Sequence, residues 1–214
     1  QAETNEEFRD RLNQSTVAYE KAAEFYEKSN EPVKAAKTSR CNAMISYLDY
    51  WLAPEAKEKK KKIDECWKLT KEALGILREA GEVYEYGRTY NELSSSVVFG
   101  FCLEWDFQAR EKLMREAVEH GEEAIKSLYS FEDSSELARA YAKTAYYRGV
   151  FDYHFLDLDV VQRDSEKIRR YWQKAKELSE DVALSEFLYP IMGVHYLSWG
   201  EGTEEAFTNL NKAL

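Results

Sequence analysis

The sequence predicts an all-α protein, an α-solenoid of four antiparallel helix pairs followed by one C-terminal helix. Three observations lead to this class. The 214 residues include only 9 Gly and 3 Pro, which disfavours a turn-rich β fold. Apolar residues recur at three- and four-residue steps, the spacing of an amphipathic helix. Four similar segments also follow one another at a period of 51 residues.

The repeat is most visible in one alanine that each segment carries: Ala22, Ala73, Ala124 and Ala175. Over the first three segments, a small, a basic and an acidic residue keep the same register. These columns are Ala36, Gly87 and Ala138; Lys37, Arg88 and Arg139; and Glu31, Glu82 and Asp133. A period of this length predicts stacked units, each of which buries its apolar face against the next.

The first helix of each unit is indicated by an apolar face. In the second unit this face comprises Ile63, Cys66, Trp67, Thr70, Ala73, Leu74 and Leu77. In the third it comprises Met114, Ala117, Val118, Gly121, Ala124, Ile125 and Leu128. The first unit has a weaker version: Leu12, Tyr19, Ala22, Ala23 and Tyr26. Because such residues share one side of a helix, each face is expected to pack inward.

Prolines and capping residues place the helix ends. Pro32 and Pro54 suit the first turn of a helix, where a missing amide hydrogen costs nothing. Asp106 and Thr203 suit N-caps, and Asp133 opens a capping-box pattern. The expected helices span about 4–29, 32–52, 54–80, 82–104, 106–130, 133–156, 161–180 and 182–199, with a ninth from 203 to 214.

The stretch SSSVVFGFCLEW is uncharged from Ser94 to Leu103 and could be taken for a strand or a membrane span. It is shorter than the roughly 18 apolar residues that a membrane-spanning helix needs. In the repeat register, Ser94 aligns with Ala43 and Ala145, which lie in second helices of their units. We therefore predict a buried helix here, with Gly100 as a point of close packing.

Two segments carry a resemblance to a known family: WKLTKEALGIL, residues 67–77, and ELARAYAKTAYYRG, residues 136–149. They resemble the first and second helices of tetratricopeptide-like (TPR-like) repeats. The resemblance implies one domain over residues 1–214 that forms a right-handed superhelix with units at about 4–52, 54–104, 106–156 and 161–199. It also implies a concave groove that binds peptides or proteins. The family's usual unit of 34 residues is shorter, so the helices here should be longer by about two turns each.

Composition and motifs exclude several classes of function. A net charge of −10 argues against a general nucleic-acid or anionic-membrane binder, because both need clustered cations. The three histidines, His120, His154 and His195, lack the spacing of metal ligands, and His154 is interpreted as a core or interface residue. Glycine-rich phosphate loops and nucleophile elbows are absent from the sequence. We therefore predict a protein that is not an enzyme, with no metal and no cofactor.

Cysteine and lysine residues add two expectations. Cys41, Cys66 and Cys102 are odd in number and far apart, which favours reduced, buried thiols in an intracellular, cytoplasmic protein. The lysine run at residues 59–62 is flanked by acids and is interpreted as a solvated helix face. A docking point for an acidic partner is the alternative for this run.

The leading functional hypothesis is a scaffold that binds a protein or peptide partner in its groove. The aromatic residues expected to reach that groove are Tyr19, Tyr90, Tyr141 and Trp172. A small-molecule-sensing or regulatory domain of a larger signalling protein is the alternative, because the chain starts at Gln1 and stops near the start of a further unit. A helical enzyme with an unrecognised site and a homo-oligomer formed through the exposed ends of the stack also stay open.

Overall fold

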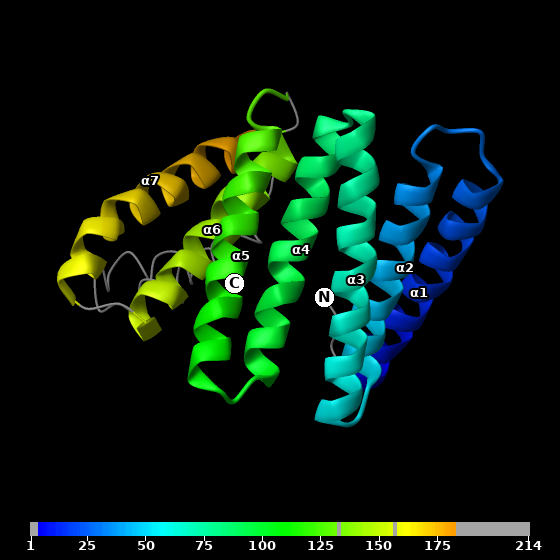
Figure 1. The fold of residues 1–214 in the computed structure, drawn as a ribbon, viewed down its shortest axis with the longest axis horizontal. Coiled ribbons are helices and arrows are strands. Elements are labelled where there is room, and N and C mark those ends of the chain that lie inside the picture. The colour runs from blue at the N-terminus through cyan, green and yellow to red at the C-terminus, as the bar shows by residue number, and fades with distance from the viewer. Residues whose placement is uncertain (1–3, 132–133, 156–157, 183–214) are drawn as a thin grey trace. The chain divides into compact units, whose positions relative to one another are not determined.

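The computed structural model describes residues 4–131, 134–155 and 158–182, and within these ranges all regular structure is helical (Figure 1). The helices are α1 (Asn5–Lys28), α2 (Lys34–Leu52), α3 (Ala56–Ala80), α4 (Val83–Leu103), α5 (Phe107–Leu128), α6 (Ser134–Phe155) and α7 (Leu158–Val182). The predicted all-α class is confirmed. The expected eighth helix and the C-terminal helix lie outside the described residues.

The chain divides into two compact units, residues 1–105 and residues 106–214. In unit 1, helices α1 to α4 pack in consecutive pairs, and in unit 2 helix α6 packs against both α5 and α7. The connections between neighbouring helices are short, so neighbours run antiparallel as expected of an α-solenoid. The assignment of the whole chain to a single domain stays a prediction.

Local sequence explains where several helices begin and end. Asp106 caps α5 as predicted, because its Oδ1 accepts from the Ala109 amide at 2.8 Å. Helix α3 ends at Gly81, whose φ of 72° lies in the left-handed region that favours glycine. Pro32 and Pro54 lie two residues before α2 and α3 begin, not in the first turn as expected. Both prolines therefore lie in the connection before the helix and not in the helix itself.

The predicted apolar faces are the buried faces. In α3, every residue of the expected face except half-buried Trp67 is buried, and in α5 the expected face is buried in full. Helix α1 differs, since only Leu12 and Ala23 are buried along its 24 residues. The weaker apolar pattern of α1 thus corresponds to a helix with more of its surface open.

The uncharged stretch lies in helix α4, as predicted, and Gly100 is a close-packing point. A Cβ atom built on Gly100 would lie 2.4 Å from ring carbons of Trp67 on α3, so a side chain here would push that ring aside. Unit 2 holds a similar contact, where a Cβ on Gly121 would lie 2.2 Å from Oγ1 of Thr144. Within the described residues, no helix combines the length and apolar composition that crossing a membrane requires.

The cysteines are all reduced, but their burial is uneven. Cys41 and Cys66 are buried, whereas Cys102 is exposed, which corrects the expectation that all three would be buried. Cys102 follows the buried Phe101 by one residue, so the helical turn of about 100° carries its side chain out of the core. Burial raises the pKa of the Cys66 thiol to about 11.

Candidate functional site

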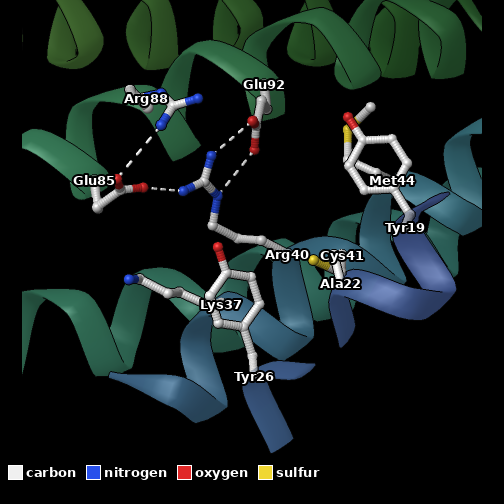
Figure 2. A pocket seen from close by; sticks show the side chains of 10 residues that line it. All are labelled: Tyr19, Ala22, Tyr26, Lys37, Arg40, Cys41, Met44, Glu85, Arg88 and Glu92. Carbon is white, nitrogen blue, oxygen red and sulfur yellow. Dashed lines mark hydrogen bonds and ion pairs between the residues drawn. The ribbon is translucent and has the colours of Figure 1, made fainter. Parts of the chain in front are cut away.

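Helices α1, α2 and α4 of unit 1 enclose a solvent-connected pocket of about 240 Å³ (Figure 2). Each helix contributes residues three or four positions apart, which places them on the one face that meets the pocket. The lining residues are Tyr19, Ala22 and Tyr26 from α1; Lys37, Arg40, Cys41 and Met44 from α2; and Glu85, Arg88 and Glu92 from α4.

Arg40 is the centre of an ion network that joins α2 to α4. Its Nε donates to Oε2 of Glu92 at 3.2 Å, and its Nη2 donates to Oε1 of Glu92 at 2.7 Å. Its Nη1 donates to Oε2 of Glu85. The Arg40 side chain is only 13% exposed. Burial disfavours its charge, but the carboxylates of Glu92 and Glu85 outweigh this effect and raise its pKa above the ordinary value.

Two further cations border the pocket. The Lys37 ammonium pairs with Glu31 and lies 5.2 Å from the centre of the Tyr26 ring. The hydrogen bond with Glu31 raises the pKa of Lys37. Arg88 donates from Nη1 to Oε1 of Glu85 at 3.4 Å. Arg88 and Arg40 thus share Glu85, one on each carboxylate oxygen.

Two tyrosine side chains from α1 form the opposite wall. Tyr19 and Tyr26 point toward the network of Arg40 in Figure 2. Among the described residues, neither hydroxyl has a hydrogen-bond partner in the protein. Burial, and then the charge of Glu92, raise the pKa of Tyr19, so its hydroxyl keeps its proton at neutral pH. The pocket therefore combines an aromatic wall with a wall of fixed charge.

Of the four aromatic residues that were expected to reach a groove, two lie in unit 1 and two in unit 2. Tyr19 lines the pocket, whereas Tyr90 lies outside it, with its ring centre 4.9 Å from that of Tyr86. Tyr141 and Trp172 belong to unit 2, and both are buried, with Trp172 only 1% exposed. A role in binding stays a prediction for all four residues.

Arg40, Glu85 and Glu92 were not predicted as site residues from the sequence. A signal for Arg40 was present, because it lies four residues after Ala36 and three before Ala43 on the buried side of α2. A cation at such a position needs an acidic partner. The partners could not be found, since Glu85 and Glu92 are 45 and 52 residues away on another helix.

Unit 2 holds a charge cluster of opposite arrangement around Glu122. The Glu122 carboxylate accepts from Nζ of Lys167 at 2.7 Å and also pairs with Arg148. Burial alone would raise the pKa of Glu122, but the hydrogen bonds from Lys167 and Arg148 outweigh it and lower the pKa. The Lys167 ammonium also lies 5.5 Å from the centre of the Tyr171 ring.

Metal-binding chemistry has no candidate cluster in the described part of the chain. No three His, Cys, Asp or Glu side chains there lie close enough to hold a metal ion. His154 is exposed near the end of α6, which overturns the core half of its interpretation as a core or interface residue, and its ring centre lies 6.0 Å from that of Phe155. Partial burial, and then the charge of Arg110, lower its pKa.

The fold defines an all-helical protein whose consecutive helices pack in pairs, and the comparisons with known proteins agree with that class. No protein-family model and no curated protein matches the sequence. Among solved structures, the chain is similar to the crystal structure of BtubC (BKLC) from P. vanneervenii, with a TM-score of 0.50. The match covers 94% of this chain and 89% of that chain at 13% sequence identity. At this identity the likeness concerns the fold alone.

Proposed function

We propose that this chain is a TPR-like scaffold that binds a protein or peptide partner, with the pocket of α1, α2 and α4 receiving one partner group. The observation that carries the proposal is the pocket's composition, two tyrosines facing a rigid arginine network. Tyrosine and arginine are the side chains over-represented in binding hot spots. A volume of about 240 Å³ is below the range of about 300–1,000 Å³ that drug-sized ligands need, and it suits a single side chain.

Burial of the register columns supports the repeat behind this proposal. Ala36 and Ala138 are 0% exposed, and Gly87 between them in the register is buried as well. In the alanine column, Ala73, Ala124 and Ala175 are 0% exposed. Ala22 is the exception, since it is half-buried and lines the pocket. The place where the first unit departs from the repeat is thus the place where the pocket lies.

Selection from a phage-displayed library of random dodecapeptides tests the proposal. We expect the full chain to enrich a consensus whose binding is lost in Tyr26→Ala, which removes most of one pocket wall. The matched control, Tyr146→Ala, changes a half-buried tyrosine of unit 2 outside the pocket and should bind the consensus peptide as the parent does. Failure to enrich any consensus, or equal loss in both variants, would remove the basis of the proposal.

A small-molecule-sensing domain is the second candidate, and one observation favours it. The pocket is formed entirely within unit 1, so it needs no partner surface to be complete. Thermal unfolding in the presence of a metabolite library separates the two candidates, because a ligand that binds only the folded state raises Tm. A rise in Tm with one metabolite, abolished in Tyr26→Ala, would favour the sensor.

A further inference from the structure

The hydrogen-bonding groups around the pocket are unequally used. Both oxygens of Glu85 accept, one from Arg40 and one from Arg88. Both oxygens of Glu92 accept from Arg40 alone. Every carboxylate oxygen on the pocket wall is therefore already engaged by a guanidinium group.

In contrast, several N–H and O–H donors around the pocket are not used by these acids. The guanidinium of Arg40 has five N–H bonds, and the two glutamates use three of them. Lys37 carries three N–H bonds and pairs with one acid, Glu31. The hydroxyls of Tyr19 and Tyr26 add two donors that have no partner among the described residues. These groups come from two helices and line the same 240 Å³ pocket.

We propose that this pocket binds an oxyanion, the carboxylate or phosphate group of a ligand, through the remaining donors of Arg40, Lys37, Tyr19 and Tyr26. The inference rests on the proposed function, since it names the chemistry of the partner group that enters the pocket. Acceptor oxygens match a surplus of donors, and charge-assisted hydrogen bonds of this kind are the stronger ones. A cationic group would have to share glutamate oxygens that each already accept from a guanidinium group.

Charge at short range is balanced. The lining residues carry three cations, Lys37, Arg40 and Arg88, and two acids, Glu85 and Glu92, and Glu31, which pairs with Lys37, brings the acids to three. The chain as a whole carries −10, so its long-range field repels an anion. Binding must therefore come from direct contacts, which salt screens less than it screens the distant surface charges.

Methionine-methyl NMR on the full chain tests the inference. Met44 lines the pocket, and buried Met114 in unit 2 is an internal reference. Protein labelled with [methyl-13C]methionine is titrated with sodium phosphate or sodium acetate at constant ionic strength, with tetramethylammonium chloride as the cationic control. We expect a saturable shift of the Met44 resonance with at least one anion, and no shift of Met114.

Conservative variants identify the donors. Tyr19→Phe with Tyr26→Phe removes only two hydroxyl groups and should weaken anion binding about 4- to 100-fold, since one neutral hydrogen bond accounts for roughly 2- to 10-fold. Lys37→Met should weaken it by roughly tenfold or more, because that donor is charged. Tyr146→Phe, outside the pocket, is the matched control and should leave the affinity unchanged. Arg40 is not substituted, because its loss would leave two acids uncompensated.

The outcomes separate the possible sources of the oxyanion. A shift with phosphate alone assigns a phosphate group, a shift with acetate alone assigns a carboxylate, and both results support the proposal. The proposal is overturned if neither anion moves Met44, if tetramethylammonium moves it equally, or if the double Phe variant binds as the parent does. A peptide consensus without acidic or phosphorylated residues would overturn the oxyanion site but keep the scaffold. Anion binding without any enriched peptide would keep the oxyanion site but remove the basis of the scaffold proposal.

Discussion

The charge clusters of the two units are mirror images in sign. In unit 1, a cation, Arg40, lies between the acids Glu85 and Glu92. In unit 2, an acid, Glu122, lies between the cations Arg148 and Lys167. The first cluster joins α2 to α4, and the second joins α5 to both α6 and α7. The difference is that arginine cannot lose its charge at accessible pH, whereas a glutamate can be neutralised by a proton.

Burial determines how strongly the stability of each unit depends on its charge cluster. The Arg40 side chain is 13% exposed, whereas that of Glu122 is 35% exposed. A buried charge that loses its partners costs several kcal/mol, while a partly exposed one is rehydrated. Unit 1 should therefore depend on its charge cluster more strongly than unit 2 does.

The largest expected effect is in unit 1, on neutralising both partners of Arg40. Glu85→Gln with Glu92→Gln leaves the guanidinium buried without a counter-charge and should lower the free energy of unfolding by about 3 kcal/mol. Urea unfolding of the full chain measures this loss. Arg40→Met is the control and should cost less, because Glu85 and Glu92 are partly exposed. A loss below about 1 kcal/mol in the double variant would show that the cluster is not important for stability.

The next effect compares the close-packed glycines of the two units. A Cβ on Gly121 would meet Thr144, whose hydroxyl donates to the carbonyl of Ala140 at 2.7 Å and is held in place. Gly121→Ala should therefore cost about 2–3 kcal/mol. Gly100→Ala meets the half-buried ring of Trp67, which has more room to shift, and should cost about 1–2 kcal/mol. Urea unfolding measures both losses.

Gly75 is the matched control for these two substitutions. It lies inside helix α3, and apart from its chain neighbours and the surrounding helix backbone no atom lies within 4 Å of a Cβ built on it. Gly75→Ala should stabilise the protein by about 0.5–1 kcal/mol, because alanine loses less backbone entropy in a helix. Losses of equal size at all three positions would contradict the close-packing explanation.

A smaller effect concerns the pH dependence of unit 2. Because the pKa of Glu122 is lowered in the folded state, its ion pairs stabilise the protein above the ordinary glutamate pKa of about 4.3. This contribution is lost as the pH falls from there through the folded-state pKa. Glu122→Gln should thus cost at most about 1 kcal/mol at pH 7 and less at pH 3, because a pair this exposed is screened by solvent. Urea unfolding at both pH values measures this cost. A cost of Glu122→Gln that is larger at pH 3 than at pH 7 would contradict the predicted direction.

These predictions depend on features that the sequence revealed to different degrees. The buried faces of α3 and α5 were predictable residue by residue, because helical periodicity is a local property that a sequence records directly. Gly100 was predictable as a small residue, but its neighbour Trp67 was not. The partners of Arg40 were not predictable either, since pairing between α2 and α4 depends on how α3 places them. The candidate pocket follows from that tertiary arrangement, and of its lining residues only Tyr19 was named in advance as a binding residue.

The smallest expected effect is that of Glu122→Gln on the opening of unit 1. It tests whether the two units unfold independently. All three cysteines lie in unit 1, so their alkylation reports on that unit alone. Exposed Cys102 should react quickly with iodoacetamide at pH 8. Cys66 should react only through opening, because it is buried and its pKa is raised to about 11.

Mass spectrometry of the alkylated peptides then compares the units directly. The double glutamine variant of residues 85 and 92 should accelerate Cys66 alkylation by roughly 100-fold if opening follows its stability loss of about 3 kcal/mol. Glu122→Gln should change the Cys66 rate by no more than about twofold, because its ion pairs lie entirely within unit 2. A fivefold or greater acceleration in Glu122→Gln would instead mean that residues 1–214 open as one cooperative unit, in line with the predicted single domain.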